Sequence, residues 1–305
     1  MKTCYQHISF ALFAFIILLA CETVVDLDIP FDRPKVTVSS SLIASESPEV
    51  RLTFSKHILD NNYNYEPIAN ATVRMIHNGN TYILEFDPEI GKYGNDAITI
   101  EAASLYQLIV EVPGYDAISV TETVPVTVPI QSFEINGIVE LEWNTREDIS
   151  LVFDDPIGEN FYEIYAFNIQ KYQYTNQSGE IVEYVNQQPI YLTAKNPVYQ
   201  QEYGGFTILF NDRLFDGNTF EMEMFASGSP FTYDPGSGGV DLDVEVESYV
   251  VLKSVSRSYY LYQTTFNLQN WNDGDPFAQP VQVFTNIPNG LGIYSAQAPF
   301  VYQVR

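Results

Sequence analysis

Cys21 is the residue whose surroundings predict the most specific chemistry in this chain. It follows Leu-Leu-Ala at residues 18–20, and an apolar run over residues 10–20 precedes it, with Lys2 as a positive start. The run is too short to cross a bilayer, which needs about 20 apolar residues. Leu-Leu-Ala-Cys is the pattern of a bacterial lipobox, in which the cysteine thiol receives a diacylglyceryl group before the leader is cut. We therefore predict a lipoprotein signal peptide over residues 1–20 and lipidation of Cys21. An ordinary leader that ends before a cysteine is the alternative.

The number of cysteines limits the kinds of site that the mature chain can form. Cys4 leaves with the leader, so Cys21 is the only cysteine of the predicted mature chain. A lipid on its thiol excludes a disulfide within that chain, a cysteine metal site and a cysteine nucleophile. Acyl chains such as palmitate contribute about 0.8 kcal/mol per buried methylene, so several of them anchor a protein without a membrane-spanning helix.

Histidines and carboxylates are the remaining candidates for catalysis. Only His57 and His77 stay in the chain after the leader is removed. The sequence has no G-x-S-x-G elbow, no H-E-x-x-H motif and no phosphate-binding glycine loop. Two carboxylates suffice for a glycosidase, but the 39 acidic residues do not single out a pair. We predict a protein without enzymatic activity and assign no catalytic residue; a surface hydrolase is the weakest alternative.

Two acidic segments carry oxygen ligands of the kind that calcium prefers. They are residues 271–276, WNDGDP, and residues 239–247, GVDLDVEVE, and neither matches an EF-hand loop. The second segment alternates as a strand does, which places four acids on one solvated face: Asp241, Asp243, Glu245 and Glu247. We predict a polar strand face with no cofactor and no metal ligand, and keep a calcium site as the weaker alternative.

The charge of the chain limits its partners. The formal net charge is −25, and loss of Lys2 leaves 13 basic against 39 acidic side chains, hence −26. Nucleic acids and anionic lipid surfaces need compensating cations, so this charge argues against both as partners. Hydrophobic residues make up 46% of the chain, which is typical of a globular protein.

Tyrosine and phenylalanine are abundant, at 22 and 20 residues. Exposed tyrosines suit protein interfaces and also stack on sugar rings. Strands prefer aromatic residues in any case, and this is the simpler explanation for any single one. The tyrosines in loop-like or polar surroundings are Tyr63, Tyr65, Tyr172, Tyr174, Tyr184, Tyr199, Tyr203 and Tyr233.

Alternating hydrophobicity predicts strands along most of the chain after residue 34. The predicted strands are residues 35–42, 49–54, 71–76, 81–86, 106–112, 117–124, 138–143, 149–153, 161–170, 181–185, 206–210, 219–225, 244–252 and 281–286. Asn78-Gly79 predicts a tight hairpin turn between the third and fourth of these. One segment differs, because Val251, Val255, Tyr259, Tyr262 and Phe266 recur at helical spacing. It predicts a helix over about 254–269 whose aromatic stripe packs on the core.

Strand spacing and composition divide the chain into segments. We expect a leader at 1–20, a lipidated tether at 21–34, an immunoglobulin-like or prealbumin-like β-sandwich at 35–127, and a second β-rich domain, sandwich- or barrel-like, at 128–305 with the one main helix. Residues 124–133 hold two prolines and no charge, which predicts a hinge or an edge strand between the domains. The fold class is therefore mainly β.

Several phrases of the sequence resemble a known family. They are CETVVDLDIP (21–30), FDDPIGENFYEIYAF (153–167), SYYLY (258–262), DPFAQPV (275–281) and TNIPNGLGIY (285–294). Together they are similar to a family of uncharacterised outer-membrane lipoproteins of Bacteroidota, known as a domain of unknown function. Its members are commonly encoded beside TonB-dependent receptors, including SusC-like ones. Pro288-Asn289 stands where the family usually has a glycine, which alters one turn. The family offers no catalytic residues to assign.

The resemblance implies a function class. We expect an outer-membrane, lipid-anchored protein on the cell surface that captures a ligand for a TonB-dependent (SusC-like) receptor, its partner. By analogy, Glu22, Asp26 and Asp28 help to route it outward. The alternative is a structural lipoprotein subunit of an envelope or secretion assembly. The sequence assigns no ligand and no binding surface.

Overall fold

The computed structural model describes residues 33–57, 59–142, 144–175, 178–199, 206–232, 244–272 and 278–305. The predicted leader, Cys21 and most of the tether lie outside these residues. Within them, no helix has the length and apolar character that a bilayer-spanning helix requires.

The fold is mainly β, as predicted, and the described residues contain one α-helix. The strands of the first half are β1 (Val36–Ile43), β2 (Glu49–Phe54), β3 (Thr72–His77), β4 (Asn80–Asp87), β5 (Lys92–Gly94), β6 (Leu105–Glu111) and β7 (Ile118–Thr123). The later elements are β8 (Ile130–Glu140), β9 (Thr145–Asp154), β10 (Phe161–Thr175), β11 (Ile181–Ile190), β12 (Leu192–Ala194), β13 (Thr207–Asn211), β14 (Thr219–Ser227), β15 (Val244–Val255), α2 (Arg257–Asn272) and β16 (Leu291–Gln303).

The first hydrophobic core lies inside a path of neighbouring strands, β16-β1-β2-β5-β4-β3-β6-β7. This path bends until β7 contacts β16, so the strands enclose the core in the manner of a sandwich. The buried positions alternate along each strand, as in β1, where Val36 and Val38 face inward and Thr37 and Ser39 face outward. Asn78 and Gly79 have φ of 50° and 77°, the left-handed values that the predicted hairpin turn requires.

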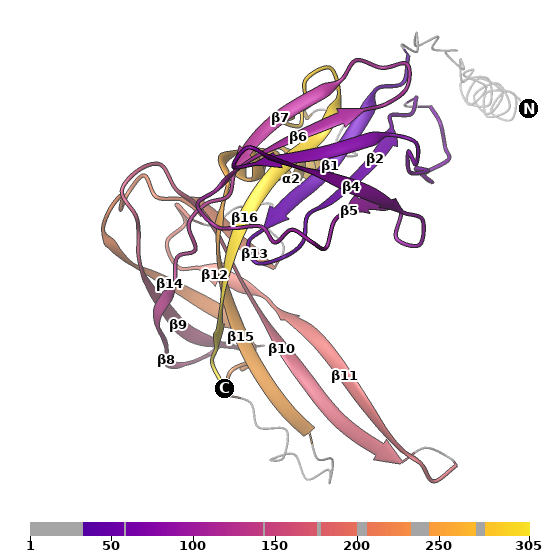
Figure 1. Cartoon of the computed structure of the whole chain (residues 1–305). Coiled ribbons are helices and arrows are strands. Elements are labelled where there is room, and N and C mark those ends of the chain that lie inside the picture. Colours follow the sequence, from indigo (N-terminus) through magenta and orange to yellow (C-terminus); the bar gives the residue numbers. More distant parts are fainter. Residues whose placement is uncertain are drawn as a thin grey trace, which may run out of the picture. The chain divides into compact units, whose positions relative to one another are not determined.

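The second hydrophobic core lies between two sheets. A four-stranded sheet in the order β12-β14-β9-β8 supplies one side, and β10, β13 and β15 supply the other. β8 is an edge strand of the smaller sheet, so residues 130–133 belong to an edge strand, one of the two predicted outcomes. The strands β10 and β11 form a long antiparallel pair whose far end extends from the core (Figure 1).

Strand β16 joins the two cores. It runs parallel to β1 on one side and antiparallel to β15 on the other, as Figure 1 shows. Its residues Tyr294, Ala296 and Ala298 belong to the first core, together with Ile287, although they come from the C-terminal part of the second half. The boundaries that we expect for two domains stay a prediction; the structure adds that the chain's last strand completes the core built from its first strands.

The helix α2 begins at Arg257, about three residues later than predicted. Val251 and Val255 belong to β15, where residues four apart also share a face, so strand spacing imitated a helical repeat. None of the helix residues is fully buried. Tyr259 and Tyr260 pack against a small cluster that includes Phe161, so only part of the aromatic stripe contacts buried side chains.

The predicted strand at 281–286 is wrong. These residues have no regular structure, because their polar groups bond to side chains rather than to a neighbouring strand. The backbone N–H of Phe284 donates to Thr265 Oγ1 of the helix at 2.9 Å. The side chain of Asn286 pairs with the backbone of Tyr294, accepting from its N–H at 3.0 Å and donating to its carbonyl at 2.7 Å. The segment thus connects the helix to β16.

Candidate functional site

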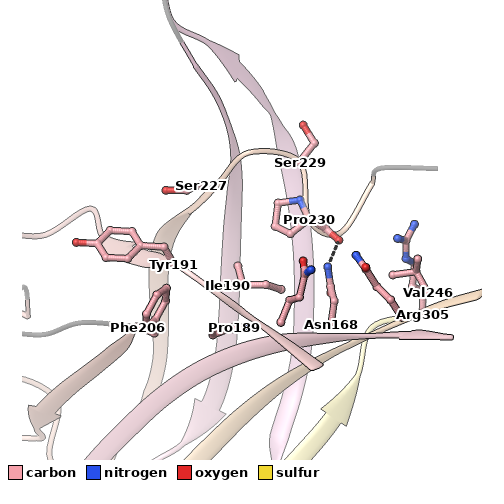
Figure 2. A pocket seen from close by; sticks show the side chains of 12 residues that line it. Asn168, Pro189, Ile190, Tyr191, Phe206, Ser227, Ser229, Pro230, Val246 and Arg305 are labelled. Atoms are coloured by element: carbon pink, nitrogen blue, oxygen red, sulfur yellow. Dashed lines mark hydrogen bonds between the residues drawn. The ribbon is translucent and has the colours of Figure 1, made fainter. Parts of the chain in front are cut away.

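A pocket of about 390 Å³ lies where β10 and β11 leave the second core. We call it the amide pocket, after the three side-chain amides that line it together with two serines and two aromatic rings: Asn168, Gln170, Gln188, Ser227, Ser229, Tyr191 and Phe206. Figure 2 shows Tyr191 and Phe206 close together on one side of Asn168, and Val246 and Arg305 on the other.

Strand register brings the three amides together. Asn168 and Gln170 are two residues apart on β10 and therefore face the same side of the sheet. Gln188 of β11 lies directly opposite Asn168 in the antiparallel pair. Val246 of β15 lies opposite Gln170 on the other side of β10. Three neighbouring strands thus present one continuous face to the pocket.

Asn168 is buried in the wall of the pocket, with 9% of its surface exposed. Its Nδ2 donates to the carbonyl of Pro230 at 3.1 Å (Figure 2). Its oxygen Oδ1 is buried and has no hydrogen-bond partner within the part of the chain that the structure describes. A buried acceptor without a partner costs about 1–3 kcal/mol. A ligand that donates a hydrogen bond here offsets that cost.

Glu147 of β9 fixes the loop that carries Ser229 and Pro230. Its side chain is fully buried, and its carboxylate accepts hydrogen bonds from the N–H of Phe231 at 3.0 Å and of Thr232 at 2.8 Å. A carboxylate that accepts from two backbone amides holds them in one geometry. One wall of the pocket is therefore fixed from within the core.

The aromatic pair supplies the apolar part of the pocket. Tyr191 and Phe206 are 42% and 51% exposed, and their rings meet edge to face with centroids 5.9 Å apart. Arg305 is the one charged side chain in the described lining, which contains no acidic side chain. Amides and hydroxyls hydrogen-bond neutral polar groups, and aromatic faces stack on rings. The chemistry suits a neutral polar ligand such as a saccharide or a peptide.

A second group of polar residues lies between the loop after β9 and the loop after β13. Among the described residues it is the one group of acids whose ligand atoms lie close enough to share a metal ion, within 4.8 Å of one another: Asp155, Asp212 and Asp216. The N–H of Asn160 donates to Asp212 at 2.7 Å, and the N–H of Gly158 donates to Asp216 at 2.8 Å. These bonds connect the two loops, which accounts for the cluster without a cation.

Asp155 has an altered acidity within this cluster. Burial raises the pKa of its carboxyl above the usual value, although hydrogen bonds from the Tyr162 hydroxyl and the Gly217 N–H oppose the shift. Burial and the neighbouring Asp155 carboxylate also raise the pKa of the Tyr162 hydroxyl. The pair serves the packing of the second core, since Tyr162 is among its fully buried residues.

The residues that the sequence suggested for catalysis, lipidation or metal binding do not come together in one site among the described residues. His77 is the last residue of β3, where it is buried, stacks on Tyr106 with centroids 4.2 Å apart and bonds to the Leu105 carbonyl at 3.0 Å, as a core histidine does.

Cys21, Asp241, Asp243 and residues 273–277 lie outside the described residues, so the lipidation and calcium hypotheses stay predictions. Glu247 pairs with Lys171 on the neighbouring strand.

The tyrosines that the sequence placed in loop-like or polar surroundings differ in their exposure. Tyr63, Tyr65 and Tyr184 are exposed, at 82%, 43% and 47%. Tyr199 lies in a turn, which fits the predicted loop-like surroundings, but its side chain is buried in the second core. It sits in an aromatic cluster whose rings meet at centroid distances near 6 Å, and the isolated sequence around it gives no sign of this. Tyr203 and Tyr233 lie outside the described residues.

A comparison with known protein families identifies the family of this chain. The model described as a domain of unknown function (DUF4249) matches residues 22–302. The chain belongs to this family. The match covers nearly all of both halves, so it includes the amide pocket apart from Arg305 and β16 apart from its last residue, Gln303. A comparison with curated proteins found no match.

Among solved structures, the chain is similar to a two-domain fibronectin type-III segment of chicken tenascin. The identity is 10%, over 73% of this chain and 91% of that chain, and the TM-score is 0.19. A likeness at this level adds nothing to the fold described above.

Sequence reasoning missed the amide pocket entirely. Its amides are common surface residues on strands, and β10 and β11 give no sign of which neighbours meet across them. The one available signal was the alternation of Asn168 and Gln170 with Phe167 and Ile169, which marks a polar face on a strand that otherwise faces the core.

Proposed function

We propose that the protein is a lipid-anchored, surface-exposed protein of the outer membrane that captures a neutral polar ligand for a TonB-dependent, SusC-like receptor. The anchor is the lipid on Cys21, and the partner is inferred from the resemblance to Bacteroidota lipoproteins. The amide pocket carries the proposal for capture, because it combines three side-chain amides with an exposed aromatic pair.

The composition of the pocket favours capture over catalysis. Hydrolysis of a glycosidic bond needs two carboxyl side chains a short distance apart, and the described lining contains no acidic side chain. Amides bind neutral hydroxyl and amide groups without changing protonation near neutral pH. A site built this way holds its ligand and releases it unchanged, which is what delivery to a receptor requires.

The amide pocket also fits a saccharide or peptide better than a charged nutrient. Its one charged side chain in the described lining is Arg305, at the rim beside Val246 (Figure 2). The rest of the protein is strongly acidic, with a formal net charge of −25, which disfavours anionic ligands at long range.

Purification from outer membranes tests the proposal. We expect the lipidated protein, extracted in mild detergent, to bring down a TonB-dependent barrel and a neutral polar small molecule or peptide that mass spectrometry identifies. Recovery of neither would contradict the proposal.

Two further measurements test the location. We expect Cys21→Ala to leave the protein soluble or as an uncut precursor, because the thiol that receives the lipid is gone. We also expect protease added to intact cells to digest the wild-type protein. Unchanged membrane fractionation of Cys21→Ala rules out the lipid anchor, and protection from protease rules out the cell surface.

A structural role in an envelope or secretion assembly is the second candidate. It is favoured by β11, which is the terminal strand of the large sheet and presents Ile181, Tyr184 and Val185 to solvent. An unpaired edge of this kind accepts a strand from another protein. Recovery of assembly proteins without a bound ligand supports this candidate over capture.

A further inference from the structure

We infer that the outward face of β1 and β2 carries a binding site for a phosphate ester, separate from the amide pocket. A pocket of about 680 Å³ lies there. We call it the phosphate pocket and define it by four hydroxyls and two cations: Thr37, Ser39, Thr53, Ser55, Arg51 and Lys56.

Strand register gathers these side chains. Thr37 and Ser39 alternate with the buried Val36 and Val38, so they point away from the core. Thr37 lies opposite Thr53 in the antiparallel pair, and Ser39 lies opposite Arg51. Hydroxyl donors from two strands therefore stand beside a guanidinium, which matches the several acceptor oxygens of a phosphate group.

The cations of the pocket are not neutralised by acids. Arg51 Nη2 donates to the carbonyl of Tyr65 at 3.2 Å, and Lys56 Nζ donates to the carbonyls of Asn62, at 2.6 Å, and Asn64. Within the described chain neither cation forms an ion pair with a carboxylate, whereas six other cations do: Arg74, Lys92, Lys171, Lys195, Lys253 and Arg257.

Three acids that are close to Arg51 or Lys56 in the sequence are engaged elsewhere. Glu49, two residues before Arg51 on β2, pairs with Lys92. Glu66 Oε1 accepts from Asn64 Nδ2 at 2.6 Å, and Asp60 Oδ1 accepts from the N–H of Asn62 at 2.9 Å. None of the three lines the pocket, and no acid is among its described lining residues. In a chain with 39 acidic residues, this is a local exception to the overall charge.

Two tyrosines extend the site beyond a bare anion. Tyr63 is 82% exposed, and Tyr65 is 43% exposed with Lys56 Nζ 5.0 Å from its ring centroid. Aromatic faces of this kind stack on a sugar or lie at a lipid interface. The pocket thus has room and chemistry for a phosphate together with the group that it esterifies.

Two sources could supply a phosphate ester of this kind, a soluble sugar phosphate and a lipid headgroup. Pro34, two residues before β1 begins, joins the pocket region to the residues that follow Cys21. A tether over residues 22–33 reaches at most about 40 Å when fully extended. If the anchor of the proposed function holds, headgroups are within that distance. The chemistry of the pocket itself does not depend on the anchor.

Titration with two probes tests the inference and distinguishes the sources. The full-length chain with Cys21→Ala is used, so that no acyl chain contributes to binding. Glucose 6-phosphate is titrated by calorimetry, and vesicles of phosphatidylglycerol in phosphatidylcholine are tested by co-sedimentation. We expect saturable binding of at least one probe. Binding of the sugar phosphate indicates a soluble ligand, and binding of the vesicles indicates a headgroup.

Matched variants assign the binding to this pocket. We expect Arg51→Gln and, separately, Lys56→Gln to weaken it about tenfold or more, since each removes a charge-assisted hydrogen bond. Arg74→Gln serves as the control, because its guanidinium is paired with Glu111 at 2.7 Å on another strand. Ser39→Ala supplies a neutral test should a charge variant unfold. Binding of neither probe, or an equal loss in Arg74→Gln, overturns the inference.

Discussion

The two halves of the described chain differ in whether they contain fully buried carboxylates. The carboxylates that are less than a tenth exposed all lie in the second half of the described chain: Glu147, Asp155, Glu163 and Asp212. The buried polar residues of the strands β1 to β7 are neutral or a histidine: Ser40, Thr53 and His77. The first core is built from alternating apolar residues, and the carboxylate nearest to it in kind is Glu122 of β7, which is only partly buried although burial raises the pKa of its carboxyl. The second core uses buried carboxylates to fix loops and the helix, and the amide pocket lies among the parts that they fix.

Glu163 shows the same principle at the helix. Its carboxylate accepts from Lys253 Nζ and from the Tyr259 hydroxyl, each at 2.9 Å. The three residues come from β10, β15 and α2, so one buried carboxylate connects three elements. Burial and this carboxylate raise the pKa of the Tyr259 hydroxyl, which keeps it a donor at any ordinary pH.

The largest expected effect comes from the strand that the two cores share. Gly292 has φ of 91°, and a Cβ there meets the Val38 carbonyl oxygen at 2.0 Å. We expect Gly292→Ala to lower the free energy of unfolding by about 4 kcal/mol, because backbone strain adds to a clash with β1. Gly79 also has a positive φ, of 77°, but open space around it, so Gly79→Ala should cost only about 1 kcal/mol.

Chemical denaturation of the two variants measures this difference. Similar losses for Gly292→Ala and Gly79→Ala would mean that β16 does not pack against β1 as closely as described.

The next effect concerns the second core alone. Glu147→Ala leaves the amides of Phe231 and Thr232 buried without their acceptor, so we expect a loss of about 3 kcal/mol in the free energy of unfolding. The matched control is Glu134→Ala, an exposed acid on the neighbouring β8, which should stay within about 0.5 kcal/mol of the wild type. Urea melts measure both. A loss in Glu147→Ala no larger than in the control contradicts the role given to buried carboxylates.

Tyr259→Phe should have a smaller effect. It removes one hydrogen bond to Glu163 and keeps the ring, so we expect a loss of about 1 kcal/mol. Tyr184 is an exposed tyrosine on β11 and serves as the control. Tyr184→Phe should change the free energy of unfolding by no more than about 0.3 kcal/mol. Thermal melts followed by circular dichroism compare the two; equal stabilities would show that the helix does not depend on Glu163.

The smallest expected effect is a dependence on pH. The folded protein holds a proton on Asp155 more tightly than the unfolded chain does, since burial raises the pKa of this carboxyl. The contribution of Asp155 to stability therefore falls as the pH rises through the window between its usual pKa, about 4, and the raised value. The gap in unfolding free energy between wild type and Asp155→Asn should be largest at low pH.

Glu247 should show the opposite trend. Hydrogen bonds from Lys171 and Tyr249 lower the pKa of its carboxyl. Its contribution is present at neutral pH and is lost as the pH falls through the lowered value. Urea melts of Asp155→Asn and Glu247→Gln across this range test the two signs. A gap that grows with pH for Asp155→Asn contradicts the assignment.

The sequence predicted the first half of the fold better than the second. Strands β1, β2, β3, β4, β6 and β7 alternate regularly, so period and turn chemistry located them, including the Asn78-Gly79 turn. The three-residue strand β5 was missed, because its segment was interpreted as a loop. The pairing of β1 with β16 was beyond such reasoning, because it joins residues about 250 positions apart and no local pattern encodes it.

Errors in the second half have two physical causes. Val251 and Val255 share a strand face at the same spacing that marks a helix face, which moved the predicted helix start. The segment 281–286 has alternating residues but bonds to Thr265 and Tyr294 instead of to a strand. The two pockets could not be predicted from the sequence, because their residues lie on different strands and only strand register brings them together.

A comparison of two adjacent glutamines tests the central claim most directly. Gln188 lines the amide pocket, and Gln187 precedes it on β11 and faces the other side of the strand. The measurement is the binding of neutral oligosaccharides and short peptides to wild type, Gln188→Leu and Gln187→Leu. We predict that a member of this panel binds the wild type, that Gln188→Leu weakens it about tenfold, and that Gln187→Leu leaves it unchanged. Absence of binding by every member, or equal losses in the two variants, would contradict capture at the amide pocket.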